Sequence, residues 1–152
     1  MKRINKISVI YSGSRKTDTI LSSIEKIINK TETEIISSVN VNSLNIRNKK
    51  RISESDLILV LGGDGTMIAS IRSLHTFNIP FLGINLGTVG FLTDLSTSKI
   101  SNLGDILKGK YIQEKRPVYE TFTDKDKKEI FLNEVVIHSG SVTKMLELEL
   151  SI

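Results

Sequence analysis

The sequence of 152 residues contains no cysteine and only two histidines, His75 and His138. The absence of cysteine excludes a disulfide framework, a thiolate nucleophile and any zinc or iron–sulfur site built on cysteine ligands. Two histidines are too few for a histidine-rich metal centre. No apolar run approaches the roughly 18 residues of a membrane span, and residues 1–6 lead into a short apolar stretch rather than a signal peptide. The sequence therefore predicts a soluble, cytoplasmic protein.

Charge is distributed unevenly along the chain. Residues 1–53 carry eleven Lys or Arg and four Asp or Glu, a net charge of +7, whereas residues 54–152 carry ten and thirteen, a net charge of −3. A basic segment of this kind can attract a polyanion such as a nucleic acid or a nucleotide. Because no aromatic stacking partners are interleaved with the cations, we interpret them chiefly as a solvated surface.

Strand and helix patterns alternate over residues 1–116. Short apolar runs predict strands at residues 7–11, 33–39, 56–61 and 79–84, and helical spacing of apolar residues predicts helices over 20–28, 67–74 and around 98–108. The run at 56–61 is apolar without alternation, as expected of a strand buried on both faces of a parallel sheet. The asparagine-rich residues 40–48 are expected to form a loop. The pattern predicts an α/β domain with a Rossmann-like parallel sheet.

The pattern changes near residue 117. Residues 118–123 and 130–138 flank a charged turn and predict a hairpin, and the alternation over 146–152 predicts a further antiparallel strand. We therefore expect a second, all-β domain to begin within residues 117–152. Three such strands present a face that requires an opposing layer, so we expect the chain to be the amino-terminal part of a longer protein.

Glycine concentrates where the predicted sheet would bind a ligand. Six of the ten glycines lie between residues 62 and 90, at the carboxyl ends of two predicted strands. In residues 62–66 (GGDGT), glycines allow the backbone to approach an anion, and the N–H groups of the following helix can bind phosphate. A carboxylate in such a turn, Asp64, suits a group that accepts a proton from an attacking hydroxyl or holds Mg²⁺. The alternative is that Asp64 and Thr66 form a helix cap and turn, with glycines serving geometry alone.

Two common nucleotide-binding motifs are missing. The sequence has no G-x-x-x-x-G-K-[ST] and no G-x-G-x-x-G. These absences exclude a Walker-type loop and the usual dinucleotide fingerprint.

Four ordered segments carry a resemblance to one enzyme family. Residues 62–66 resemble the GGDG signature shared by NAD kinases, diacylglycerol and sphingosine kinases and 6-phosphofructokinases. Residues 83–94 (GINLGTVGFLTD), 114–116 (EKR) and 132–138 (LNEVVIH) resemble segments of NAD kinases in the same order. The sequence is thus similar to the NAD kinase family, and most of all to its proteobacterial members.

The resemblance implies an enzyme that phosphorylates the adenosine ribose 2′-hydroxyl of NAD to give NADP, using ATP or another phosphoryl donor and Mg²⁺ or another divalent cation. It implies that Asp64 is the catalytic aspartate and assigns no metal-ligating residue. The residues that it assigns to cofactor binding are Gly62, Gly63, Gly65, Thr66, Phe91, Asn133, Glu134 and Lys144. It further implies small-molecule substrates, no nucleic-acid or membrane partner, a homo-oligomer in the full-length protein, and an NAD-binding role for residues 117–152.

Simpler roles remain open for several of these residues. Phe91 is expected either to line the adenine pocket or to lie in the core under its turn, and Asn133 and Glu134 either to hold NAD or to form a polar turn. Lys144 is alternatively an exposed strand residue, and Asp94 is expected to cap its turn. The alternative functions are a GGDG-type kinase acting on a lipid or sugar phosphate, and a non-catalytic nucleotide-binding module. As a fragment, the chain is expected to have little activity alone.

Overall fold

The computed structural model describes residues 2–13, 15–87, 90–122 and 128–138, together with Met145, Glu147 and Glu149. The chain divides into two compact units, Met1–Arg116 and Pro117–Ile152. Lys144 and the apolar residues of the strand expected over 146–152 lie outside the described residues. Within the described part, no helix is both long enough and apolar enough to cross a membrane.

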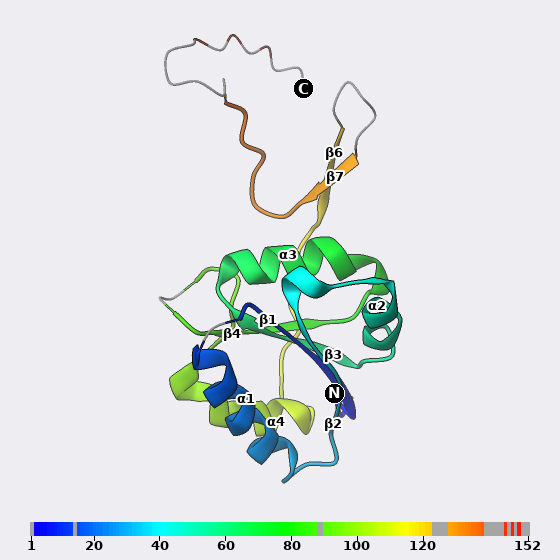
Figure 1. Ribbon diagram of the computed structural model, residues 1–152, viewed down its shortest axis with the longest axis vertical. Coiled ribbons are helices and arrows are strands. Elements are labelled where there is room, and N and C mark those ends of the chain that lie inside the picture. Colours follow the sequence, from blue (N-terminus) through cyan, green and yellow to red (C-terminus); the bar gives the residue numbers. More distant parts are fainter. Residues whose placement is uncertain are drawn as a thin grey trace. The chain divides into compact units, whose positions relative to one another are not determined.

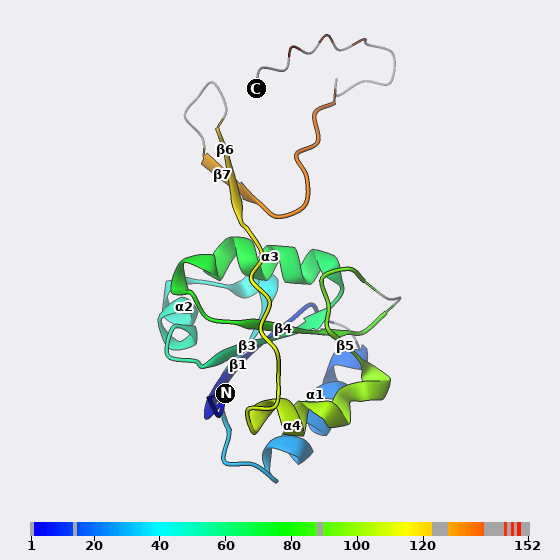
Figure 2. The same cartoon turned by 180° about the vertical axis from the view of Figure 1, so that it is seen from behind.

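The first unit is built on a parallel sheet of five strands in the order β2-β1-β3-β4-β5. Figure 1 labels the first four of these strands, and Figure 2 labels β5. The strands are β1 (Lys6–Tyr11), β2 (Glu34–Asn40), β3 (Leu57–Gly62), β4 (Phe81–Asn85) and β5 (Leu95–Ser96). The α-helices are α1 (Arg15–Ile28), α2 (Ile46–Ile52), α3 (Asp64–Leu74) and α4 (Leu103–Leu107). Three 3₁₀ helices complete the unit: η1 (Val41–Ser43), η2 (His75–Phe77) and η3 (Thr97–Asn102). The prediction of a Rossmann-like α/β fold is confirmed.

The central strand β3 supplies both hydrophobic cores. All six of its residues are buried, and successive side chains point to opposite faces of the sheet. Leu57, Leu59 and Leu61 pack in one core with residues of α1 and α4, whereas Ile58 and Val60 pack in the other with residues of α2 and α3. Figures 1 and 2 show these two helix pairs on opposite sides of the sheet. Helices on both faces explain why β3 is apolar without alternation.

The prediction of a loop over residues 40–48 is wrong, because this segment contains η1 and the start of α2. The Asn40 side chain accepts the N–H of Asn42 at 2.9 Å, and the Asn45 side chain accepts the N–H of Asn48 at 3.0 Å. Asparagine is among the best N-cap residues, so two of the asparagines mark helix starts. Ile52, at the end of α2, is fully buried and anchors the helix to the core.

The second unit contains an antiparallel pair, β6 (Tyr119–Phe122) and β7 (Lys128–Phe131). The rings of Tyr119 and Phe131 stack with their centroids 5.3 Å apart, and Glu120 forms an ion pair with Lys128. This pair agrees with the expected start of an all-β domain. The second strand of the hairpin is shorter than expected, because residues 134–138 have no regular secondary structure and are exposed.

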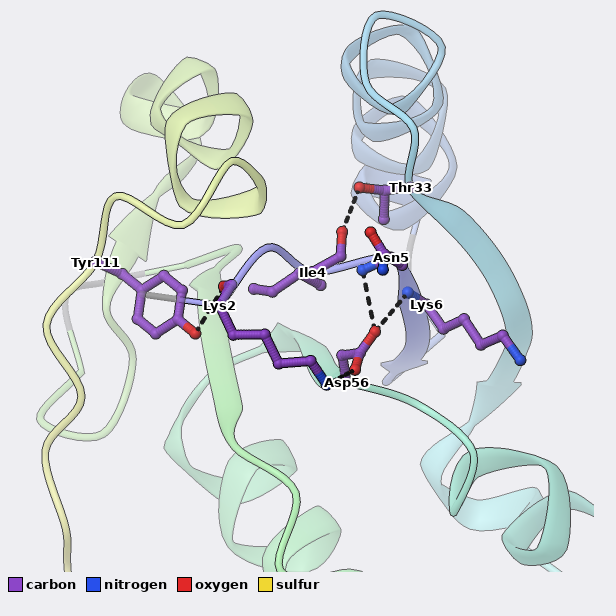
Figure 3. Close-up of polar contacts among 7 residues, drawn as sticks. All are labelled: Lys2, Ile4, Asn5, Lys6, Thr33, Asp56 and Tyr111. Atoms are coloured by element: carbon purple, nitrogen blue, oxygen red, sulfur yellow. Dashed lines mark hydrogen bonds and ion pairs between the residues drawn. The ribbon is translucent and has the colours of Figure 1, made fainter.

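The amino edge of the sheet is tied together by Asp56, the residue before β3 (Figure 3). Its Oδ2 atom accepts the backbone N–H groups of Asn5 and Lys6, each at 3.0 Å, and its Oδ1 atom accepts the Lys2 ammonium at 2.9 Å. Partial burial raises the pKa of the Asp56 carboxyl, but the hydrogen bond from Lys2, the backbone donors and the charge of Lys2 together lower it below the ordinary value. Asp56 thus joins the entry of β3 to that of β1.

Candidate active site at the carboxyl edge of the sheet

The chain turns directly from β3 into α3 through the GGDGT sequence. Asp64 is the first residue of α3, and the preceding Gly63 is the N-cap, without a side-chain cap. The N–H groups of Thr66 and Met67 bond to Gly63 O at 3.0 and 3.1 Å, whereas those of Asp64 and Gly65 precede the first helical bond. The alternative in which Asp64 caps its own helix is wrong, because its carboxylate is directed elsewhere.

The Asp64 carboxylate bonds to the turn that follows β4. Its Oδ2 atom accepts the N–H of Phe91 at 2.9 Å, and its Oδ1 atom accepts the N–H of Leu92 at 3.0 Å. Asp64 and Phe91 are 27 residues apart in sequence, so two separate glycine-bearing turns meet at one carboxylate. Each carboxylate oxygen has a second lone-pair site, so the group can still accept a hydrogen bond from a ligand hydroxyl.

Three glycines in or near these two turns are required by the packing of the chain itself. A Cβ atom added to Gly62 would lie 2.3 Å from Thr66 Oγ1, and one added to Gly90 would lie 2.2 Å from Asp64 Oδ1. At Gly83 the added atom would lie 2.9 Å from the backbone of Thr93. For these positions, and for Gly62 among the expected ligand-binding residues, close internal contact explains the choice of glycine.

Gly63 and Gly65 differ from these three. A Cβ atom added to either would meet no atom within 4 Å. Neither has a positive φ, a conformation that would favour glycine. The fold therefore gives no reason for glycine at these two positions, whereas close approach of a ligand to the backbone does. Together with the N–H groups of Asp64 and Gly65, they form an open backbone surface beside the carboxylate.

The turn after β4 is held by several polar contacts. Asp94 Oδ2 accepts the N–H of Gly83 at 2.8 Å, and the Asp94 N–H donates to Gly83 O at 3.0 Å. The Asn85 side chain accepts the N–H of Gly87 at 2.8 Å. The Lys16 ammonium, from the first turn of α1, reaches the Leu86 carbonyl at 3.4 Å. Lys16 was not predicted from the sequence as a residue near this edge of the sheet. The available signal was a cation just after the turn that ends β1.

Phe91 is 92% exposed, so the alternative of a core aromatic is wrong. Its backbone, not its ring, touches Asp64. The exposed ring is free to stack on a planar ligand. Thr66 is half-buried, and its side chain occupies the space that a side chain at position 62 would need.

The other expected ligand-binding residues belong to the second unit. Asn133 and Glu134 are exposed and lie two and three residues after the end of β7, whereas Lys144 lies outside the described residues. The structure therefore brings together Asp64, the GGDGT turn and the turn after β4. The assignment of Asn133, Glu134 and Lys144 stays a prediction.

Asp64 is the only acidic residue of the GGDGT turn. The described residues contain no group of three or more His, Cys, Asp or Glu side chains that could hold a metal ion. The described part of the chain therefore does not form a metal cage by itself. Mg²⁺ in phosphoryl-transfer sites is often held by one or two carboxylates, with substrate phosphates and water completing its coordination.

Known proteins resemble the part of the chain that contains the two turns. The model of the ATP-NAD kinase N-terminal domain matches residues 6–111, which include both turns at the carboxyl edge. The chain belongs to this family.

Three NAD kinases illustrate the similarity. That of Salmonella gallinarum is 43% identical over 104 residues, which cover 65% of this chain and 36% of the relative. That of Aromatoleum aromaticum is 41% identical over 105 residues, covering 66% and 35%, and that of Hahella chejuensis is 34% identical over 116 residues, covering 72% and 39%. The match spans less than two fifths of each NAD kinase, and all three alignments involve mainly the first unit.

Proposed function

We propose that this chain carries the phosphoryl-transfer edge of an NAD kinase, which transfers the terminal phosphoryl group of ATP to the 2′-hydroxyl of the adenosine ribose of NAD. The observation that supports this best is the arrangement at the start of α3. A fixed carboxylate lies beside two glycines that leave the backbone open, in a chain that belongs to the ATP-NAD kinase N-terminal domain family.

In this proposal Asp64 orients the attacking hydroxyl. The hydroxyl oxygen attacks the terminal phosphorus, its proton passes to Asp64, and the bond to the bridging oxygen breaks to release ADP. The N–H groups of Asp64 and Gly65 face the negative charge of the phosphates. The hydrogen bonds from Phe91 and Leu92 keep the carboxylate in one orientation, which favours in-line transfer.

The divalent cation belongs with the donor phosphates in this proposal. Asn133, Glu134 and Lys144 are proposed to contact NAD from the second unit, with the exposed Phe91 ring beside the adenine. An amide and a carboxylate suit this task because they can bond to vicinal hydroxyls. The homo-oligomer also stays a prediction.

The test is NADP formation by the full-length gene product and its Asp64→Asn variant. We expect turnover to fall by about 100-fold to 10,000-fold, because an amide cannot take the hydroxyl proton, while NAD still binds. Asp105→Asn is the matched control, since Asp105 is also in the first turn of a helix but outside the site. Near-normal turnover in Asp64→Asn would contradict the role of Asp64. A panel of NAD, diacylglycerol and fructose 6-phosphate identifies the acceptor, and transfer to either of the last two would contradict the proposed reaction.

A further inference from the structure

A groove of about 380 Å³ lies between the edge strand β2 and helix α2. Residues 35–38 of β2 form one wall, and Arg47, Asn48 and Arg51 of α2 form the other. Its volume is within the range of small-ligand sites. The groove is separate from the turn that carries Asp64, because β1 lies between β2 and β3 in the sheet.

The two arginines of the groove have no neutralising partner within the described part of the chain. Neither guanidinium makes a hydrogen bond or an ion pair there, and no acidic residue lines the groove. The hydroxyl of Ser37, on the opposite wall and on the α2 side of the sheet, is equally without a hydrogen bond among the described residues. The groove therefore combines two positive charges with one unused hydroxyl donor.

The stability of α2 accounts for the charge of Arg51 but not for that of Arg47. Lys49, Lys50 and Arg51 lie in the last turn, where the helix dipole favours cations. Arg47 lies in the first turn, where the dipole disfavours a cation, and that turn contains no acidic residue to compensate. Because Arg47 and Arg51 are four residues apart, they project from the same side of the helix.

The wall that carries the arginines is held in place. The N–H of Asn48 donates to the Asn45 side chain at 3.0 Å, and its side-chain amide donates to Ser43 O at 3.1 Å. Buried Ile52 fixes the end of the helix. The two guanidinium groups are thus carried by an anchored helix facing a strand.

We propose that this groove binds the dianionic phosphoryl group of a small ligand, with Arg47 and Arg51 as charged donors and Ser37 as a hydroxyl donor. Two guanidinium groups are balanced by one phosphoryl group, which carries about −1.5 to −2 charge at pH 7, but not by one carboxylate. Ile36 also lines the groove and gives it an apolar part that suits the organic portion of a phosphate monoester.

The test titrates the chain with inorganic phosphate, phenyl phosphate and acetate, and follows the backbone amide resonances of residues 35–51. We expect saturable binding of the phosphates with a Kd on the order of 1 mM, since one phosphoryl group on an open groove is a weak ligand. Tighter binding of phenyl phosphate assigns the site to phosphate monoesters, and equal binding assigns it to free phosphate. Acetate should bind at least about 10-fold more weakly than phosphate.

Two double variants distinguish phosphate binding in the groove from nonspecific attraction of phosphate to the basic residues of α2. Arg47→Gln with Arg51→Gln should weaken phosphate binding by about 10-fold or more, because it removes both charged donors. Lys49→Gln with Lys50→Gln removes the same charge from residues that do not line the groove, and should change the Kd by less than about twofold. The proposal is overturned by absence of saturation, by equal effects of the two double variants, or by acetate binding as tightly as phosphate. All four substitutions are of polar side chains outside the core, and thermal unfolding verifies that the variants fold.

Discussion

Replacing Asp56 by asparagine tests how the amino edge of the sheet is held. Both backbone donors, from Asn5 and Lys6, bond to the same oxygen, Oδ2. An asparagine carbonyl placed there can keep both bonds but not their ionic character. The substitution also removes the charge that attracts the Lys2 ammonium. Asp56→Asn therefore weakens the contacts without leaving an N–H group unpaired.

The magnitude follows from these two bonds. A hydrogen bond to a charged group contributes about 1.5–3 kcal/mol, roughly twice a neutral one. The Asp56 side chain is 22% exposed, so we take the lower end, on the order of 1.5 kcal/mol for each charged bond. Halving the contribution of each of the two hydrogen bonds lowers the free energy of unfolding by about 1.5 kcal/mol. This corresponds to a fall in Tm of about 3–6 °C for a chain of this size.

The effect should depend on pH. Because the pKa of Asp56 is lowered in the folded chain, the ionised carboxylate stabilises the fold above the ordinary value of 3.8, and this stabilisation is lost as the pH falls through the lowered pKa. The difference between the parent chain and Asp56→Asn should therefore be full at pH 7. It should shrink as the pH falls below 3.8 and through the lowered pKa of Asp56.

The assay is urea and thermal unfolding followed by circular dichroism at stepped pH. Asp105→Asn is the control, because exposed Asp105 makes one ion pair, with Lys110 at 3.1 Å, and should change the free energy of unfolding by roughly 0.5 kcal/mol. Equal effects of the two substitutions at pH 7 would refute the reasoning. So would a deficit of Asp56→Asn that does not narrow in acid.

Three further predictions concern the site and helix α2. Gly90→Ala should displace Asp64 and reduce NADP formation by the full-length gene product by about 100-fold, because the added Cβ lies 2.2 Å from Oδ1. Gly63→Ala should leave the free energy of unfolding within about 0.5 kcal/mol of the parent but weaken ATP binding, and unchanged binding would count against the open glycine surface. Asn45→Ala should lower the free energy of unfolding by about 1 kcal/mol through loss of the α2 cap, whereas Asn42→Ala should not, as urea unfolding would show.

The sequence by itself determined the architecture of the first unit. The apolar run of β3 needs apolar partners on both faces, and a parallel sheet between two helix layers supplies them. Glycines directly after β3 and β4 place two turns at the carboxyl edge, because parallel strands all end on the same side. The lengths of the strands and the first residues of the helices are harder to predict from the sequence. The asparagines of residues 40–48 are as suited to capping helices as to forming loops, and burial of Ile52 decides between the two.

Only the tertiary structure decided which residues of the two turns act together. Nothing in the sequence shows that Asp64 bonds to the backbone of Phe91 and Leu92, since such contacts depend on the order of β3 and β4 in the sheet. Nor does the sequence separate Gly90, which makes room for Asp64, from Gly63, which faces open space. A glycine has no side chain whose chemistry reveals its purpose. Its role is set by the atoms that surround it, and those atoms come from distant parts of the chain.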